Sequence, residues 1–310
     1  MDLFDGAVRV DHFARGTDVY FLTHYHSDHM SGLKAGWHRG TIFCSRDTAA
    51  LLRAGKGLPE DRIHVLPLEK PETIELLHGP VTVTAFDANH CPGACMFHFE
   101  NGKERTLVTG DFRLDDAMRK RLPRFEGVDT LLVDVTYDRP RYAFPTQADV
   151  IEKIVQRVAA SDKELTAVLT YTVGKNKILN GLFEAFGEPF FLEPRHLPLF
   201  QALGYGNMVT GDPDHARFFA LGPRALEPTL RRLHGNWRRK ALVIHPTGWA
   251  VDGRIRPGSV GFPYSEHCSW PELCEFLEAV QPGRIVVTEG GKATRRSLDW
   301  KPLDRGTVLD

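Results

Sequence analysis

The chain has 310 residues, of which 42% are hydrophobic and 25% are charged, and its formal net charge is −1 at pH 7. These values are ordinary for a globular protein and exclude an intrinsically disordered chain. The near-neutral charge also excludes a generally basic nucleic-acid coat, so any nucleic-acid binding must depend on local patches or on metal ions.

Cysteine usage and hydropathy bear on the compartment. The chain has 5 cysteines and no C-x-x-C pair, so we expect no disulfide framework and a reducing, intracellular compartment. The N-terminal residues lack the apolar segment of a signal peptide. No apolar run approaches the roughly 18 residues of a membrane span, so we expect no membrane partner.

The first 140 residues alternate short apolar runs with Gly, Pro and Asp, a pattern typical of closely spaced strands. One helix is expected from Asp47 to Arg53. The expected strands are Val19–Leu22, Thr41–Cys44, Ile63–Leu66, Val81–Phe86, Met96–Phe99, Thr106–Val108 and Leu131–Val135.

After Pro140 helical patterns alternate with strands, which favours a small α/β module. Capping boxes at Thr146 and at Ser269 mark two helix starts. The expected elements are a helix from Thr146 to about Ala160, a strand over Ala167–Thr172, a helix over Lys175–Phe186, a strand over Ala241–His245, a helix from Ser269 to about Val280 and a strand over Ile285–Thr288. Residues 188–240 give no clear pattern.

The segment from His24 to His29 has the pattern H-x-H-x-D-H. His24 and His26 are two residues apart, so at a strand end they point the same way, while Asp28 and His29 follow the turn. Imidazole and carboxylate groups at this density suit zinc. A polar surface turn with unrelated histidines is the alternative interpretation, and the density of the pattern argues against it.

Further ligands are expected downstream, because a two-metal site needs more donors than this segment supplies. The candidates are His90, Asp111 and His267, although each alone could be an ordinary loop residue. The hypothesis assigns His24, His26 and His90 to one metal, Asp28, His29 and His267 to the other, and Asp111 as the bridge. Such ions would ionise a shared water and hold the phosphate oxygens of an in-line displacement.

Two more acids complete the expected site. Asp11 and Asp134 are expected to orient ligand imidazoles without binding the metal themselves. Ordinary roles in a turn or at a strand end are the open alternative for both residues. Cys91 and Cys268 adjoin proposed ligands, and we expect buried, unreactive thiols there. The residues expected to carry catalysis are Asp28, Asp111, Asp134 and His267.

These motifs resemble a known family. The H-x-H-x-D-H turn, A-x-H-C-P-G at 88–93 and T-G-D-F-R at 109–113 resemble the metallo-β-lactamase superfamily. The segments D-V-T-Y at 134–137, Y-T-V-G-K at 171–175, P-T-G-W at 246–249 and P-Y-S-E-H at 263–267 resemble its β-CASP branch of DNA repair nucleases, the Artemis, Apollo and yeast cross-link-repair type. Departures at Ala94, Val135, Cys268 and Trp270 touch no proposed ligand and bear on fine specificity.

The resemblance implies an α/β (α+β) fold, a four-layer αββα metallo-β-lactamase sandwich with an inserted β-CASP α/β cap domain. The expected boundaries are 1–140 for the first part of the sandwich, 141–247 for the insert and 248–310 for the second part. The resemblance also implies one or two Zn²⁺ ions, with Mg²⁺ or Mn²⁺ as alternatives, and a monomer. A nuclear location in a eukaryote, or a cytoplasmic one otherwise, follows from the family alone.

The implied function is a zinc-dependent 5′→3′ DNA exonuclease in interstrand cross-link or double-strand break repair. In the exonuclease members a lysine and a serine matching Lys175 and Ser265 form a 5′-phosphate pocket. Lys175 follows Gly174 at an expected helix N-terminus, which attracts anions, although a solvated lysine is the alternative. An Artemis-like endonuclease, an RNA-processing nuclease, a small-ester or lactam hydrolase and an inactive scaffold remain alternatives.

Overall fold

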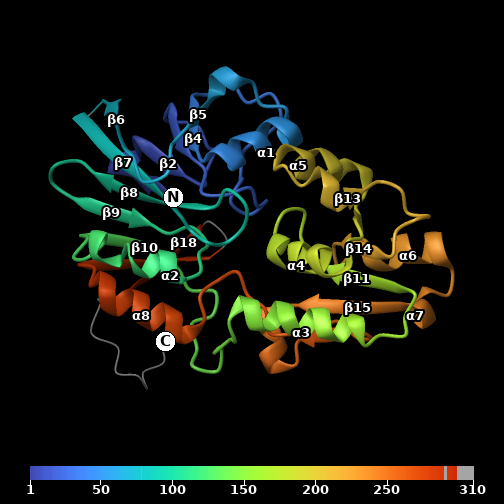
Figure 1. Ribbon diagram of the computed structural model, residues 1–310. Helices are drawn as coiled ribbons and strands as arrows, with labels where there is room; N and C mark the ends of the chain where they lie inside the picture. Colours follow the sequence, from blue (N-terminus) through green and yellow to red (C-terminus); the bar gives the residue numbers. More distant parts are fainter. Residues whose placement is uncertain (78, 290–291, 299–310) are drawn as a thin grey trace. The chain divides into compact units, whose positions relative to one another are not determined.

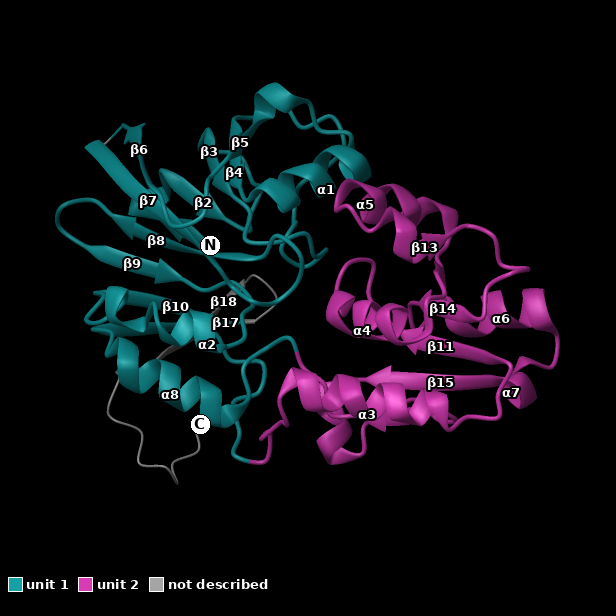
Figure 2. Cartoon of the chain, viewed as in Figure 1, with its two compact units in different colours: residues 1–140, 266–310 teal, residues 141–265 magenta. Residues whose placement is uncertain are grey.

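The computed structural model describes residues 1–77, 79–289 and 292–298 (Figure 1). The chain forms two compact units, one of Met1–Pro140 with Glu266–Asp310 and one of Arg141–Ser265 (Figure 2). Residues 248–265, which the sequence groups with the closing segment, pack within the second unit. No helix in the described ranges is long and apolar enough to cross a membrane.

The first unit contains two sheets. The five-stranded sheet has the order β1-β2-β3-β4-β5 and is parallel except for the β1–β2 pair. Its strands are β1 Asp2–Leu3, β2 Val8–Val10, β3 Val19–Phe21, β4 Thr41–Cys44 and β5 Ile63–Val65. The strand expected at Thr41–Cys44 therefore has the predicted bounds.

The second sheet is seven-stranded, with the order β18-β17-β10-β9-β8-β7-β6. Strands β9, β10 and β17 run parallel, and the remaining pairs are antiparallel. The strands are β6 Pro71–Leu76, β7 Gly79–Asp87, β8 Cys95–Glu100, β9 Arg105–Val108, β10 Thr130–Asp134, β17 Arg284–Glu289 and β18 Lys292–Leu298.

Apolar cores join these sheets to each other and to helices. Phe21 of the first sheet packs on Phe97 and Phe99 of the second, so one core lies between the sheets. On the other face of the seven-stranded sheet, Phe276 of α8 packs in a core with Leu131. The helices of this unit are α1 Arg46–Lys56, which lies beside β5, α2 Asp116–Arg119 and α8 Trp270–Val280. The α/β sandwich expected from the resemblance is confirmed.

Local sequence signals set the ends of the long helices. Ser45 caps α1 by accepting a hydrogen bond from the Thr48 N–H, and Gly57 ends it in the left-handed region at φ 62°. The Ser269 capping box is complete, because Glu272 also accepts from the Ser269 N–H. These caps place α8 immediately after the His267 loop.

The second unit is a six-stranded, fully parallel sheet with the order β13-β12-β14-β11-β15-β16. Its strands are β11 Leu165–Leu169, β12 Phe190–Phe191, β13 Val209–Thr210, β14 Phe218–Leu221, β15 Ala241–Pro246 and β16 Val260–Phe262. Every residue of β11 and β14 is buried, as expected for strands covered on both faces.

Helices cover both faces of this sheet. Ile154 and Ile178 belong to a core on one face, and Leu230 and Trp237 belong to a core on the other. The helices are α3 Gln147–Ala159, α4 Asn176–Phe186, α5 Leu197–Ala202, α6 Leu226–His234 and α7 Trp237–Lys240. Open α/β sheets of this kind bind ligands at the carboxyl ends of their strands.

Candidate metal centre

Polar residues of the first unit converge at the ends of its strands. The segment from His24 to His29 follows β3, His90 follows β7, Asp111 follows β9, and His267 lies three residues before the start of α8. Carboxyl ends of neighbouring strands meet at one sheet edge, which brings side chains far apart in sequence together. The sequence-predicted residues that gather here are His24, His26, His29, His90, Asp111 and His267.

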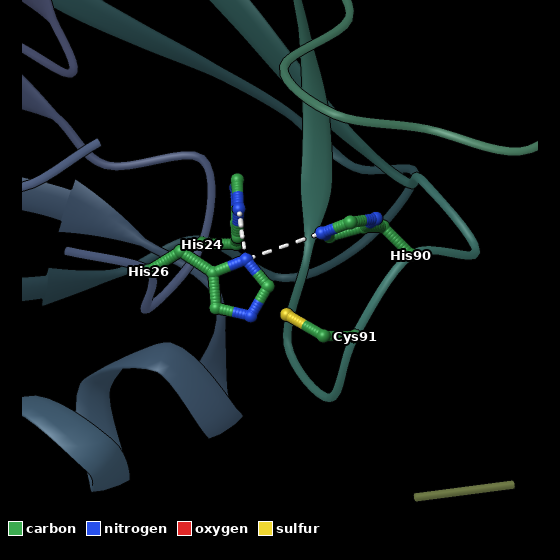
Figure 3. A group of neighbouring side chains, drawn as sticks. All are labelled: His24, His26, His90 and Cys91. Carbon is green, nitrogen blue, oxygen red and sulfur yellow. Dashed lines mark hydrogen bonds between the residues drawn. The ribbon is translucent and has the colours of Figure 1, made fainter. Parts of the chain in front are cut away.

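The first group of possible metal ligands contains three imidazoles and a thiol (Figure 3). His26 Nδ1 lies 2.9 Å from His24 Nε2 and 3.2 Å from His90 Nε2. The Cys91 sulfur points toward the same ring of His26, and the donor atoms of all four residues lie within 4.8 Å of one another. Three nitrogens at this spacing match three ligands of one tetrahedral ion.

Asp111 connects this group to the other imidazoles. Its Oδ2 atom lies 3.6 Å from His24 Nε2 and 3.7 Å from His90 Nε2, whereas its Oδ1 atom lies 3.2 Å from His29 Nε2. His267 forms a further group of possible ligands with His90 and Asp111. The two oxygens of one carboxylate therefore face different imidazoles.

Hydrogen bonds behind the rings fix their tautomers. His90 Nδ1 lies 2.9 Å from the Glu266 carbonyl oxygen, and His29 Nδ1 lies 2.8 Å from Asp11 Oδ2. His267 Nδ1 lies 2.7 Å from Asp134 Oδ2. Because these oxygens only accept, each Nδ1 carries a hydrogen, and Nε2 is the nitrogen of each ring that is left to bind a metal ion.

Asp11 also positions His24 through Thr23. Thr23 donates its hydroxyl hydrogen to Asp11 Oδ2 at 2.7 Å and its backbone N–H to Asp11 Oδ1 at 2.8 Å. The Thr23 oxygen can then accept from His24 Nδ1 at 3.0 Å. Sequence reasoning missed this role of Thr23, and its position directly before the first histidine was the available signal.

The donor set fits a divalent metal ion. His29 is buried, and its Nε2 atom lies 3.2 Å from Asp111 Oδ1. An imidazole nitrogen and a carboxylate oxygen at this distance can share either a proton or a metal ion. Imidazole nitrogens with a carboxylate oxygen are the ligands that zinc takes in hydrolytic sites.

The pKa directions agree with a site built around positive charge. Burial holds the pKa values of His24 and His90 well below the usual range, so both rings are neutral. Burial also opposes charge on His267, but Asp134 and Asp111 outweigh it and raise its pKa to about 9. Burial would raise the pKa of Asp111, yet His29 and His267 hold it well below its usual range.

Three other residues that the sequence analysis singled out are Asp28, Cys268 and Cys91, and each has a different environment in the structure. Asp28 is exposed and belongs to none of the three ligand groups found among the described residues, so its role as a ligand stays a prediction. Cys268 is buried, and its sulfur accepts from the Leu114 N–H at 3.3 Å. Cys91 is also buried, as expected, and its sulfur lies within 4.8 Å of a nitrogen atom in each of three imidazoles.

Lys175 and Ser265 lie in the second unit. Lys175 is 9% exposed and immediately precedes α4, with a backbone φ of 58°. Ser265 is 3% exposed, and its carbonyl oxygen accepts from Gln147 Nε2 at 2.9 Å. Burial of a lysine beside a helix N-terminus departs from the solvated-lysine alternative.

The layered sheets and the histidine–aspartate cluster define a metallo-β-lactamase fold, and sequence comparisons agree. Residues 6–169 match the family described as "Beta-lactamase superfamily domain". Residues 207–289 match the family described as "DNA repair metallo-beta-lactamase". The chain therefore belongs to the metallo-β-lactamase superfamily, and its residues 207–289 resemble the DNA repair branch of that superfamily.

Individual relatives agree with this assignment. "DNA cross-link repair protein SNM1" of Arabidopsis thaliana is 32% identical over 312 residues, which cover 92% of this chain and 64% of that protein. "5' exonuclease Apollo" of Mus musculus is 32% identical over 278 residues, covering 86% of this chain and 50% of that protein. This chain thus spans less than two thirds of either relative.

A solved structure shares the fold. A protein of unknown function from Enterococcus faecalis V583 superposes with a TM-score of 0.60, covering 89% of this chain and 77% of that one. Its sequence identity is 14%, so the likeness concerns the fold alone.

Proposed function

We propose that the chain is a zinc-dependent 5′→3′ DNA exonuclease that hydrolyses phosphodiester bonds from 5′-phosphorylated ends, in interstrand cross-link or double-strand break repair. The observation that carries the proposal is the position of Asp111, whose Oδ1 faces His29 while its Oδ2 faces His24 and His90. A carboxylate placed in this way can bridge two metal ions, which is a common arrangement in phosphodiester hydrolysis.

The side chains would divide the work as follows. His24, His26 and His90 would hold one ion, and His29 and His267 a second, with Asp28 as a further ligand of the second. A zinc pair here would supply a Lewis acid for the phosphate oxygens and an acidified water. Asp11 and Asp134 hold His29 and His267 in the tautomer with a free Nε2, because each accepts the Nδ1 hydrogen.

The second unit supports a site for the 5′-phosphate. Lys175 supplies an ammonium group at the start of α4, whose N-terminus no side chain caps. Next to it, Asn176 is 6% exposed, and its Nδ2 has no hydrogen-bond partner in the described ranges. A phosphate would satisfy both donors, and Ser265 would add a hydroxyl. We assign this unit, Arg141–Ser265, as the β-CASP insert that the sequence places at 141–247.

The names of two relatives support DNA as the substrate. One is a DNA cross-link repair protein and another a 5′ exonuclease. A nuclear location in a eukaryote, or the cytoplasm otherwise, and a monomeric state belong to the same proposal. Mg²⁺ or Mn²⁺ in place of zinc is an alternative for the ion.

A cleavage assay tests the proposal. Purified protein is given 3′-labelled single strands with and without a 5′-phosphate, as DNA and as RNA. A ladder that shortens from the 5′ end and requires the phosphate is the expected result. Single internal cuts would identify an endonuclease, preferential cutting of RNA an RNA-processing enzyme, and no cleavage by zinc-loaded protein an inactive scaffold.

A further inference from the structure

The loop between β11 and α4 carries an exposed aromatic ring. Tyr171 lies two residues after the end of β11, and it is 62% exposed. The other exposed large apolar side chains in the described part of the chain are all aliphatic. An exposed tyrosine ring does not gain the stabilisation that burial of its large apolar surface would give. We therefore expect a function for this ring.

Tyr171 lies beside the cation of the same loop. The Lys175 ammonium lies 4.9 Å from the centre of the Tyr171 ring and 5.8 Å from the centre of the Tyr264 ring. Lys175 is itself buried, and its charge is close to one buried ring and one exposed ring. A phosphate at this ammonium would therefore lie within a few ångströms of an accessible aromatic face.

The topology of the sheet makes this loop a ligand-binding position. β11 pairs with β14 on one side and with β15 on the other, all in parallel. The loop follows the carboxyl end of β11, and α4 starts from it. The carboxyl ends of adjacent parallel strands are where such sheets bind nucleotides, with phosphate at the helix N-terminus.

We propose that Tyr171 is the platform on which the base of the 5′-terminal nucleotide stacks while Lys175 holds its phosphate. This inference rests on the proposed function, since it assumes a terminal phosphate at Lys175. Stacking on an aromatic face is tolerant of base identity, because every base has a π face. The platform would thus add affinity for a terminal nucleotide of any sequence, and it would select against an end that lacks a base.

The backbone of the loop supports a binding role over a purely structural one. Lys175 has φ 58°, a left-handed conformation that is strained for a residue with a Cβ atom. A solvated lysine gains nothing from this strain, whereas a lysine aimed at a ligand does. The Asn176 amide braces the same turn by accepting the Gly174 N–H at 3.1 Å.

A binding experiment with two probes tests the platform separately from the phosphate site. Isothermal titration calorimetry compares a deoxynucleoside 5′-monophosphate with 2-deoxyribose 5-phosphate, which has the same phosphate and no base. Wild-type protein should bind the nucleotide about fivefold to 150-fold more tightly, the range for one stacked base. Tyr171→Ala should bring this ratio close to one, while Tyr171→Phe should keep it.

The outcomes separate the two proposals. Lys175→Ala should weaken both probes by a similar factor, and failure of wild-type protein to bind either probe would contradict the phosphate site itself. The platform is overturned if the wild-type ratio is near one, or if Tyr171→Ala weakens both probes equally, since the ring then only shields the lysine. Because Tyr171 is exposed, its removal should leave the fold intact, and circular dichroism checks this.

Discussion

His29 Nε2 and Asp111 Oδ1 face each other at 3.2 Å, and both side chains are buried. Without metal, the negative charges of Asp111 and Asp11 outweigh burial and raise the pKa of His29 well above its usual range. The pair therefore demands a positive charge between its members, either a proton or a metal ion.

The first prediction concerns this carboxylate. Asp111→Asn removes the negative charge that faces both sets of imidazoles, so we expect the zinc content of the protein to fall. Mutating a residue that only hydrogen-bonds to a metal ligand lowers metal affinity by up to roughly 100-fold, and we expect a larger drop in zinc affinity for Asp111→Asn. Elemental analysis of dialysed protein measures the stoichiometry. Asp116→Asn is the matched control, because the Asp116 side chain is 94% exposed. Unchanged zinc content would refute the bridging role.

The second prediction concerns the acids behind the rings. Asp11 accepts hydrogen bonds on both oxygens, from Thr23 on one and from Thr23 and His29 on the other. An asparagine accepts on one oxygen only and turns an N–H toward a donor, so Asp11→Asn should lower zinc affinity by about 10- to 100-fold. Competition with a fluorescent chelator measures this.

Asp134→Asn should act in the same way through His267, because Asp134 holds the Nδ1 hydrogen at 2.7 Å. Here too Asp116→Asn serves as the exposed control. If either variant bound zinc like the wild type, the acid in question would have only a structural role.

The sequence predicted which side chains gather at the candidate metal centre better than it predicted the elements of the second unit, for a physical reason. A ligand cluster such as His24 to His29 can be recognised from its residue types and spacing without knowledge of the fold. The strands that end before His90 and Asp111 are recognisable in the sequence as apolar runs. Residues 188–240 instead form short elements, among them β12 with 2 residues and α7 with 4 residues. Elements that short show no periodicity, because the packing of the sheet determines them.

Some site details depend on tertiary contacts that no pattern encodes. The proximity of Cys91 to the imidazoles depends on how the loop after β7 folds over α1, where Ser45 and Thr48 donate to the Gly93 carbonyl oxygen at 2.6 and 3.0 Å. The exposure of Asp28 likewise follows from the turn geometry rather than from its place in the motif. A motif therefore predicts which residues gather but not how each side chain is turned.

The third prediction concerns metal removal. An ion that binds only the folded protein stabilises it by about 4 kcal/mol when its free concentration is a thousandfold above Kd. Chelation of zinc should therefore lower the melting temperature by several degrees, and added zinc should restore it. Calcium, which prefers oxygen ligands, should not restore it. A melting temperature indifferent to chelation would argue against a filled site.

The fourth prediction concerns Asp28. Since this residue is exposed, Asp28→Asn should change the free energy of unfolding by less than about 0.5 kcal/mol. If Asp28 is a ligand of the second ion, the same substitution should abolish cleavage in the labelled-strand assay. Ser27→Ala is the neighbouring exposed control and should cleave normally. Full activity of Asp28→Asn would remove Asp28 from the ligand set.

The fifth prediction separates function from strain at Lys175. Lys175→Ala and Lys175→Gly should both reduce the preference for 5′-phosphorylated strands, by roughly 10- to 150-fold for a charge-assisted contact. They should differ in stability, because glycine adopts φ 58° without the cost that alanine bears. Urea denaturation should therefore find the glycine variant more stable than the alanine variant by about 1 kcal/mol.

Lys177→Ala is the matched control for Lys175, since Lys177 is exposed and donates to Gln147 at 2.8 Å. This variant should keep the wild-type preference for a terminal phosphate. If Lys175→Gly were more stable than Lys175→Ala and preferred 5′-phosphorylated strands as strongly as the wild type, the left-handed backbone at this position would not contribute to phosphate binding. A stable but unselective glycine variant would instead show that the chain accepts strain at this position in order to aim an ammonium group at a phosphate.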